Sequence, residues 1–594
     1  MRIPRRNTDK FVREIASQCM VSRQDRGSRG NYLESFVMTG SEKPDSPSMY
    51  NKVFTSLDDL ESLLFSPVSL RFHIADPDIP NILNESKGRA AASKIRQMCR
   101  QADADTKISQ AVNSGLVKGA GILKQTMRKT DLRCSLIKPE DFGVLREDHA
   151  KLDEDMGAFC HSMLITFDQF SNLIYANPDR ADLLKKAKRY MRSPGEGLSS
   201  SRQGSAMNVV VGGMYPLQAA GGVGGQNNLR GVVDWMGKPK PSIDPTVAAA
   251  MLELLEVWIW DDEREDWATF QLIGDDILIM GKYTIINALA YDQATAMSAP
   301  PLKGVHPYTP FVPNPVDDYF WGRSEVPMLI LLQEAINSRI IGTNRMLRMQ
   351  EDPSIKFVGA TGVNQNTLAR FKKPGGYWSD TNPSAKVEKE NVQIPQDLWA
   401  SLHEYERMFD DLMGLPPTAR GHGEKGVRSG NHAEALVRMF SPRFKDRALV
   451  VERCVEDFGA LTFDLCRAHI DKKLLAWVPQ GAAGLEGDTD KALLETLQPP
   501  APGLVPVYFQ FGDLPDDVRL TVDSHSASPA FSSEAKGLAF DLLKVGAMSP
   551  SDLVEHVDAP DPDELQAGIM RRDIAKAEAH DKELAAKAAK HSHK

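Results

Sequence analysis

The fold is decided between residues 308 and 350, where the sequence is YTPFVPNPVDDYFWGRSEVPMLILLQEAINSRIIGTNRMLRMQ. Prolines divide the first part of this stretch, and each of them disfavours helix in the residue that precedes it. The second part has no glycine before Gly342. It opens with Ser324, a residue type that caps helix N-termini, and with Pro327, which a first turn tolerates. The stretch therefore predicts an extended lead-in that runs into one long helix.

The predicted helix has an apolar stripe and several polar faces. The stripe consists of Leu329, Leu332, Ile336, Ile340 and Leu347, which recur at helical spacing. The other faces carry charged residues, and Glu334, Arg339, Arg345 and Arg348 are the candidate contact residues among them. Taken alone, the pattern fits an ordinary amphipathic core helix.

A second helix is predicted to return the chain. Residues 351–395 are polar and rich in turn-forming residues, with short β-like runs at 354–360 and 385–394, and they are too few to hold a core of their own. Residues 396–413 again show helical periodicity and end before Pro416 and Pro417. The central unit predicted is thus a helical hairpin with a small β insertion at its tip.

A short basic loop follows the hairpin, at residues 415–430 with the sequence LPPTARGHGEKGVRSG. One interpretation is an exposed linker that is basic by chance. The alternative is a flexible finger that touches phosphate without reading sequence, because cationic side chains on a glycine-rich backbone contact the nucleic-acid backbone but lack a rigid arrangement for base edges. The candidate DNA-contacting residues are Arg420, His422, Lys425 and Arg428.

The flanking regions complete the expected organisation. Residues 1–48 are rich in arginine and are expected to form a partly ordered, solvated arm, or an electrostatic contact with DNA or a partner. Residues 49–320 show mixed helix and strand patterns, with a glycine-rich segment at 193–231. Residues 431–480 predict a long helix kinked or restarted at Pro442, and residues 481–594 predict β-like segments followed by helical tail segments.

Several classes of function are disfavoured. A Walker A loop is missing, because the nearest glycine spacing, Gly231 to Gly237, is one residue too long and Pro239 stands where a hydroxyl is required. Four acidic residues near the turn of a predicted hairpin, between Asp261 and Glu265, fit a solvated tip better than a cation site. The six cysteines form no CxxC pair, and no apolar run reaches bilayer length. We therefore predict no catalytic site, cofactor or metal.

The formal net charge of -9 limits any nucleic-acid contact to local patches such as the basic loop. His591 and His593, near the C-terminus, are expected to be inert rather than a metal tail. The expected fold class is α+β, mainly α.

The order of elements resembles that of the portal proteins of tailed double-stranded DNA bacteriophages. The resemblance is carried by the run HPYTPFVPNPVDDYFWGRSEVPMLILLQEAIN from His306 to Asn337 and by SGNHAEALVRMF at residues 429–440, after the basic loop. It extends from about residue 50 to about residue 473 and weakens at both ends.

The resemblance implies a division of the chain into named parts. After an arm at 1–48, residues 49–320 and 431–480 would form a wing, 321–350 and 396–414 a stem, 351–395 a clip, 415–430 a tunnel loop and 481–594 a crown. Lys372 and Lys373 in the clip would be partner contacts, although ordinary surface lysines fit the same sequence.

The resemblance also implies a function and a set of partners. The chain would form a ring, expected to be a dodecamer, at one capsid vertex of the virion after assembly in the bacterial cytoplasm. The ring would be a non-enzymatic conduit for genome packaging and ejection, with non-specific double-stranded DNA in its channel. Partners would be the terminase large subunit, a head-tail adaptor, and the major capsid and scaffold proteins, with no membrane. The alternative is a tail adaptor or other structural virion protein that does not grip DNA.

Overall fold

The computed structural model of the chain describes residues 3, 7–43, 47–65, 72–75, 82–128, 131–175, 177–190, 251–274, 277–280, 304–351, 355–361, 366, 382–389, 395–414, 442–470, 472–479, 504–514, 519–522, 540–545 and 553. The chain is a mixed α and β protein rich in helix, with several small sheets, so this part of the expectation is confirmed. It divides into two compact units. The first contains residues 1–35, 57–325 and 423–594, and the second contains residues 36–56 and 326–422.

The largest sheet of the first unit has five antiparallel strands in the order β4-β5-β6-β7-β8. The strands are β4 (Phe142–Val144), β5 (Ala158–Thr166), β6 (Met251–Asp261), β7 (Asp266–Ile273) and β8 (Ile277–Met280). The β6–β7 pair is the hairpin that alternating apolar residues predicted, which is confirmed. Asp261 accepts a hydrogen bond from the Glu263 amide at 3.2 Å, as in an ordinary turn.

A three-stranded sheet, in the order β3-β2-β9, faces part of this sheet across an aromatic core. Its strands are β2 (Gly121–Arg128), β3 (Asp131–Ile137) and β9 (Tyr308–Phe311). The rings between the sheets stack or meet edge-on, which suits their quadrupoles. They belong to Phe142, Phe159, Trp258, Trp267, Tyr308, Phe320 and Trp321.

A buried ion pair crosses this core. Lys124 Nζ lies 2.9 and 3.0 Å from the two carboxylate oxygens of Glu256, and both side chains are about 5% exposed. The Tyr308 hydroxyl and the Trp258 indole also donate to Glu256, at 2.7 and 2.8 Å. Burial alone would favour the protonated acid, but Lys124 and these hydrogen bonds outweigh it and lower the pKa of Glu256 to about 2. Burial lowers the pKa of the neighbouring His161 to about 3.

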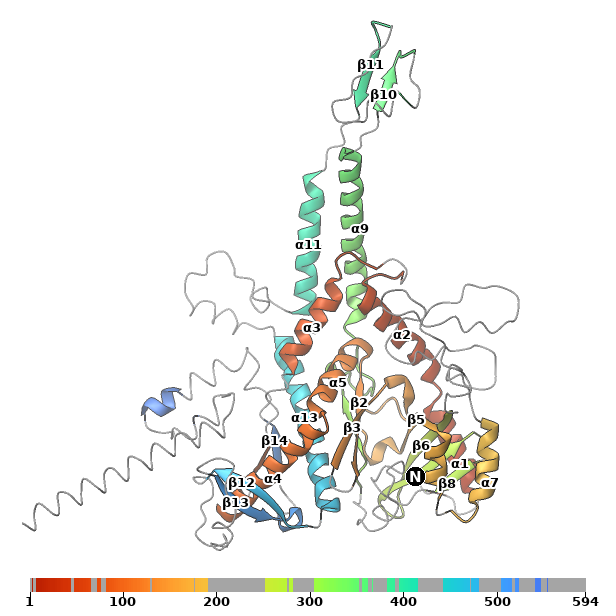
Figure 1. The fold of residues 1–594 in the computed structure, drawn as a ribbon, viewed down its shortest axis with the longest axis vertical. Helices are drawn as coiled ribbons and strands as arrows, with labels where there is room; N and C mark the ends of the chain where they lie inside the picture. Colours follow the sequence, from red (N-terminus) through yellow and green to blue (C-terminus); the bar gives the residue numbers. More distant parts are fainter. Residues whose placement is uncertain are drawn as a thin grey trace, which may run out of the picture. The chain divides into compact units, whose positions relative to one another are not determined.

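Helices surround the two sheets of the first unit. They are α1 (Thr8–Cys19), α4 (Ile82–Gln101), α5 (Ala104–Lys118), α6 (Phe167–Leu173), α7 (Arg180–Ala187) and α13 (Pro442–His469). Figure 1 shows α13 as a long helix beside the strands, and hydrogen bonds fix it to β2. The Gln125 side chain donates to the Phe458 carbonyl at 2.9 Å and accepts from the Thr462 hydroxyl at 2.8 Å.

Two further sheets involve the C-terminal region. Strand β1 (Phe72–Ala75) pairs with β14 (Arg519–Val522), and β12 (Leu474–Pro479) pairs with β13 (Leu504–Phe509). The β-like segments predicted after residue 480 are thus strands. They pair with strands of the first unit, so among the described residues they do not form a separate body.

The second unit contains a helical hairpin. It consists of α9 (Val326–Glu351) and α11 (Gln396–Met413), which lie side by side in Figure 1, with β10 (Ile355–Val358) and β11 (Lys386–Lys389) paired at their far end. Residues 36–56 of this unit hold the end of α2 (Arg23–Thr39) and the start of α3 (Lys52–Leu64). The predicted α11 matches the observed bounds, and Pro327 is the second residue of α9, as expected for a first-turn proline.

The expectation of a partly ordered arm at residues 1–48 is wrong for residues 7–43, which the structure describes and which hold two helices. Helix α1 buries one face, which includes Val12 and Ile15, against the five-stranded sheet. The arginines of α2 have partners within the first unit. Arg23 donates to Glu253 at 2.7 Å, and Arg26 donates to Glu147 at 2.8 Å and lies over the Trp321 ring. Arg23 and Arg26 were expected to be solvated, but each is paired with an acidic residue more than 100 positions away in the sequence.

The structure also defines three element boundaries. Residues 121–128 are strand β2, because α5 ends at Lys118 and Gly119 takes a left-handed conformation with φ +100°. Helix α3 begins at Lys52, so Ser56 is an internal, buried residue. The long helix predicted within residues 431–480 ends at His469 and is followed by β12. The glycine-rich segment 193–231 lies outside the described residues.

Candidate functional site

The candidate site is the helical hairpin of the second unit, because it combines a rigid inner face with exposed apolar side chains. On its inner side, α9 buries Leu329 and Ile336, two members of the predicted stripe. Leu347 belongs to the same predicted stripe but is 39% exposed. The apolar stripe therefore packs only near the beginning of the helix.

Two buried amides of α9 hold the segment 36–56. The Gln333 side chain accepts from the Lys52 amide at 3.0 Å and donates to the Tyr50 carbonyl at 2.8 Å. Asn337, one turn further, donates to the Gly40 carbonyl at 2.7 Å. This role of Gln333 and Asn337 was not predicted from the sequence. The available signal was a pair of amide side chains four residues apart on one helix face.

A lysine joins the segment 36–56 to the second helix of the hairpin. The Lys52 ammonium lies 2.8 Å from an Asp410 carboxylate oxygen and donates to the Glu406 carbonyl at 2.7 Å. The Lys52 side chain is 5% exposed and also approaches the Phe409 ring. Because these contacts satisfy a buried cation, they fix α11 against the same segment that α9 contacts.

The outer surface of the hairpin is apolar at several points. Leu331 and Ile341 on α9 are 81% and 61% exposed, and Trp399 and Met408 on α11 are 48% and 44% exposed. Single exposed apolar residues are common on protein surfaces, whereas several large ones on two paired helices indicate a contact surface. We call these four residues the hairpin surface.

The four predicted contact residues of this helix do not form one cluster. Glu334 accepts a hydrogen bond from the Glu42 amide at 2.9 Å, and the Arg339 guanidinium lies 5.9 Å from the Tyr405 ring centroid. These two residues serve contacts inside the unit. Arg345 and Arg348, nearer the β10–β11 tip, are exposed. Only the last two are thus placed to meet another molecule.

The other predicted site residues cannot be placed. Arg420, His422, Lys425 and Arg428 in the basic loop, and Lys372 and Lys373 in the insertion, lie outside the described residues. The DNA-contacting and partner-contacting roles of these six residues therefore stay predictions.

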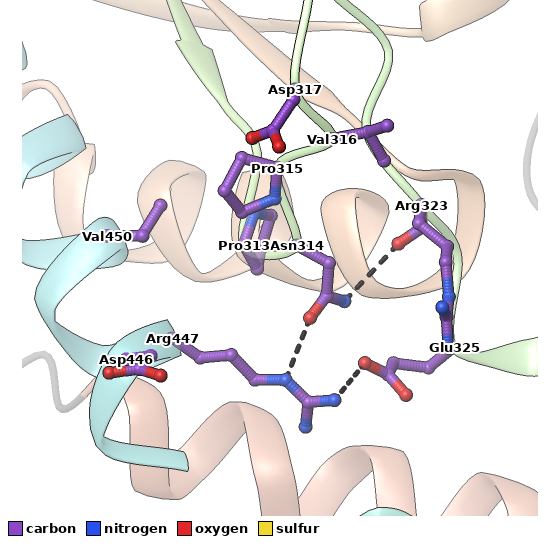
Figure 2. Close-up of a pocket in the computed structure, with 10 residues that line it drawn as sticks. All are labelled: Pro313, Asn314, Pro315, Val316, Asp317, Arg323, Glu325, Asp446, Arg447 and Val450. Carbon is purple, nitrogen blue, oxygen red and sulfur yellow. Dashed lines mark hydrogen bonds and ion pairs between the residues drawn. The ribbon is translucent and has the colours of Figure 1, made fainter. Parts of the chain in front are cut away.

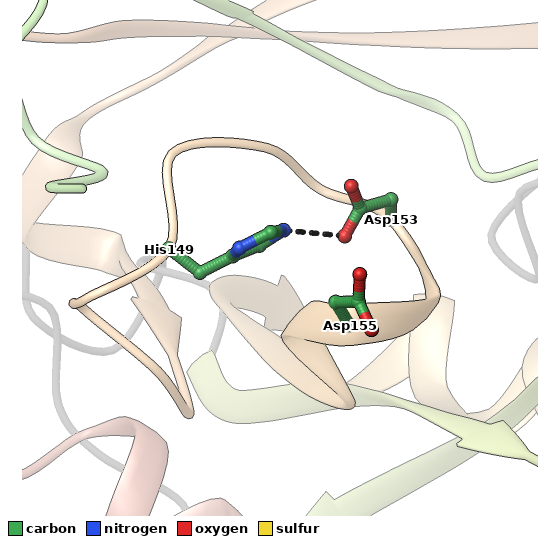
Figure 3. Close-up of side chains that lie close together, drawn as sticks. All are labelled: His149, Asp153 and Asp155. Atoms are coloured by element: carbon green, nitrogen blue, oxygen red, sulfur yellow. Dashed lines mark hydrogen bonds and ion pairs between the residues drawn. The ribbon is translucent and has the colours of Figure 1, made fainter. Parts of the chain in front are cut away.

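One group of possible metal ligands occurs in the described part of the first unit. Figure 3 shows the His149 ring directed at Asp153, with Nε2 2.6 Å from Oδ1, and Asp155 beside them. Asp155 is exposed, and the other two are only half-buried. The hydrogen bond between His149 and Asp153 accounts for this arrangement. We assign no metal to it.

None of the helices in the described residues combines the length and apolarity needed to cross a bilayer. In comparisons with known proteins, no family model matches the chain, and no curated protein is significantly similar to it in sequence. The function is therefore inferred from the residues and the geometry of the fold.

Proposed function

We propose that this chain is the subunit of a homo-oligomeric ring of the portal type, in which the helical hairpin forms the stem and the paired strands β10 and β11 form part of the clip. The ring would sit at one capsid vertex and act as a conduit for DNA. Its clip would be the docking surface for a terminase during packaging and for a head-tail adaptor afterwards.

The observation that carries the proposal is the hairpin surface. A closed ring uses head-to-tail contacts, so each subunit needs two different adhesive faces. Leu331 and Ile341 on α9, together with Trp399 and Met408 on α11, place apolar side chains on both helices of one hairpin. Burial of such residues is worth about 1.5–3 kcal/mol each. Repeated contacts of this kind support a stable ring.

The test is the mass and shape of the purified protein, by native mass spectrometry and negative-stain imaging. We expect closed rings, because head-to-tail contacts produce closure. The expected number of about a dozen copies is the one that the resemblance implies. Leu331→Asp and Ile341→Asp are expected to shift the rings to monomers. Ser338→Asp adds the same charge at an exposed polar position of α9 and is the matched control. A wild-type chain that stays monomeric at high concentration would count against the ring.

A second experiment separates a DNA conduit from a structural ring without a DNA-gripping role. Replacing Arg420, Lys425 and Arg428 together with alanine removes three cations from the basic loop. We expect rings to form normally but DNA packaging and retention to fall, because phosphate contacts would be lost. Unchanged packaging and retention would favour the adaptor alternative.

A further inference from the structure

One contact defines the register of the two helices of the hairpin. The Arg339 guanidinium of α9 lies 5.9 Å from the Tyr405 ring centroid of α11, so these two side chains face each other. The helices run in opposite directions, as Figure 1 shows. Six residues from this contact toward β10 and β11, α9 therefore reaches Arg345 and α11 reaches Trp399. Each step covers about 9 Å at 1.5 Å per residue, so Arg345 and Trp399 lie at the same height along the hairpin.

Arg345 and Trp399 point to opposite sides of the hairpin. Both helices are right-handed, so an equal step along the hairpin turns both side-chain directions through the same angle and in the same sense. Two side chains that face each other at one height are therefore followed, at every other height, by two that point in opposite directions. Six residues turn the direction by about 600°, which is about 120° away from the facing direction. Arg345 is exposed and Trp399 is 48% exposed, as these outward directions require.

The two outward sides differ in chemistry. On α9, Ile341, Arg345 and Arg348 recur at intervals of four and three residues and form one exposed stripe. On α11, Trp399 and His403 form an exposed pair four residues apart. A guanidinium lies favourably over the face of an indole ring, and arginine and tryptophan are both enriched where proteins meet. One side thus offers cations, and the other offers an aromatic face.

The charges of the two helices are also complementary. From Arg339 onward, α9 carries three arginines and one acid, whereas α11 carries five acids and one arginine. Of the α11 acids, Asp397, Glu404 and Asp411 are exposed. The α9 surface of one molecule is therefore attracted to the α11 surface of another, while two α9 surfaces repel each other. This favours contact between unlike sides over a two-fold contact between like sides.

We propose that the two sides of the hairpin bind each other in neighbouring copies of this chain, with Arg345 of one copy over the Trp399 ring of the next. The inference rests on the proposed ring, in which the hairpin is the stem. Copies related by a ring axis that runs along the stem keep the same height. Residues that share a height and point in opposite directions therefore meet across each interface. By the same register, Ile341 of one copy would contact the next copy near His403.

Cysteine cross-linking of the full-length protein tests this contact. The double variant Arg345→Cys with Trp399→Cys is oxidised with copper phenanthroline and separated without reducing agent. We expect a ladder of linked chains up to the ring size that native mass spectrometry gives, because each copy is joined to both neighbours. A mixture of the two single variants should stop at linked pairs, since each copy then brings one new thiol to the contact.

Two controls accompany the cross-linking. Ser338→Cys with Trp399→Cys places the first thiol at another exposed position of α9, about 10 Å nearer the base of the hairpin, and should give no ladder. The wild-type chain, whose six cysteines are buried or half-buried, measures the background.

A second measurement does not depend on introduced thiols. Rings of the wild type, Arg345→Gln, Trp399→Leu and the double variant are diluted, and mass photometry gives the concentration at which half of the rings have dissociated. Each single substitution should raise this concentration at least tenfold. The double substitution should raise it little further, because both single substitutions remove the same contact. Arg146→Gln, at an exposed arginine of the first unit, should leave it unchanged.

The outcomes separate this contact from the ring itself. The contact is overturned, and the ring stands, if rings form but thiols at positions 345 and 399 cross-link no better than thiols at 338 and 399. Additive effects of Arg345→Gln and Trp399→Leu on ring dissociation overturn it in the same way. If the double cysteine variant gives only linked pairs, the copies meet about a two-fold axis and the head-to-tail contact is overturned. A wild-type chain that stays monomeric overturns both the contact and the proposed ring.

Discussion

Removing the buried ammonium of Lys124 is expected to destabilise the first unit severely. The substitution Lys124→Met keeps the apolar length of the side chain and removes its charge. Glu256 then remains buried with donors from Tyr308 and Trp258 but without its cation. Breaking a buried ion pair in this way costs about 3–5 kcal/mol, because the remaining charge is uncompensated.

The lowered pKa of Glu256 follows from the same buried environment. Its pKa falls from the ordinary value of 4.5 to about 2, a difference of 2.5 units. At about 1.36 kcal/mol per unit, this environment contributes about 3 kcal/mol to folding at neutral pH. Because the pKa is lowered in the folded state, the contribution is present above pH 4.5 and is lost as the pH falls toward 2.

The assay is urea unfolding followed by tryptophan fluorescence, since Trp258 and Trp267 lie in the aromatic core. Lys124→Met should lower the midpoint strongly, and Lys138→Met, at an exposed position of the same unit, should not. The double variant Lys124→Met with Glu256→Gln should recover part of the loss, because no buried charge is left alone. A loss below about 1 kcal/mol for the single variant, or no recovery in the double variant, would refute the reasoning.

Three further predictions follow from described contacts. Arg26→Ala should lower the free energy of unfolding, measured in thermal or urea unfolding, by about 2 kcal/mol, because the ion pair and the ring contact are lost. Arg146→Ala, at an exposed position, should lower it little. Equal effects of the two substitutions would favour the solvated-arm interpretation. The pKa of His161 is about 3 in the folded state, against an ordinary value of 6.5. Below pH 6.5 the unfolded state therefore binds a proton that the folded state does not. The free energy of unfolding should fall by about 1.4 kcal/mol for each pH unit below 6.5. His161→Leu should flatten this slope between pH 6.5 and 4.5, and an unchanged melting profile would contradict the assignment. Gly121→Ala should unfold the first unit, because the added Cβ would lie 2.0 Å from the Ala111 carbonyl oxygen. Gly342→Ala has open space around it in α9 and should stabilise that helix by about 0.5–1 kcal/mol. Thermal unfolding measures both effects.

The sequence by itself determined the elements whose signals are local. Helical periodicity and the positions of Pro327 and Pro442 predicted α9, α11 and α13 close to their observed bounds, and alternating apolar residues predicted the β6–β7 hairpin. These patterns suffice because hydrogen bonds within helices, and between strands of a hairpin, join residues that are near in sequence. The long helical hairpin followed from the same signals.

Tertiary structure decided what depends on distant partners. The sequence predicted that the arginine-rich N-terminal segment is solvated. In the fold, Arg23 pairs with Glu253 and Arg26 pairs with Glu147. Strand β1 formed with β14, which lies more than 400 residues away, and residues 121–128 became a strand because two other strands flank them. The pocket around Arg447, shown in Figure 2, likewise joins two segments separated by more than 100 residues. Burial and long-range pairing set these outcomes, and a local pattern contains no information about which distant charge or strand edge will be its partner.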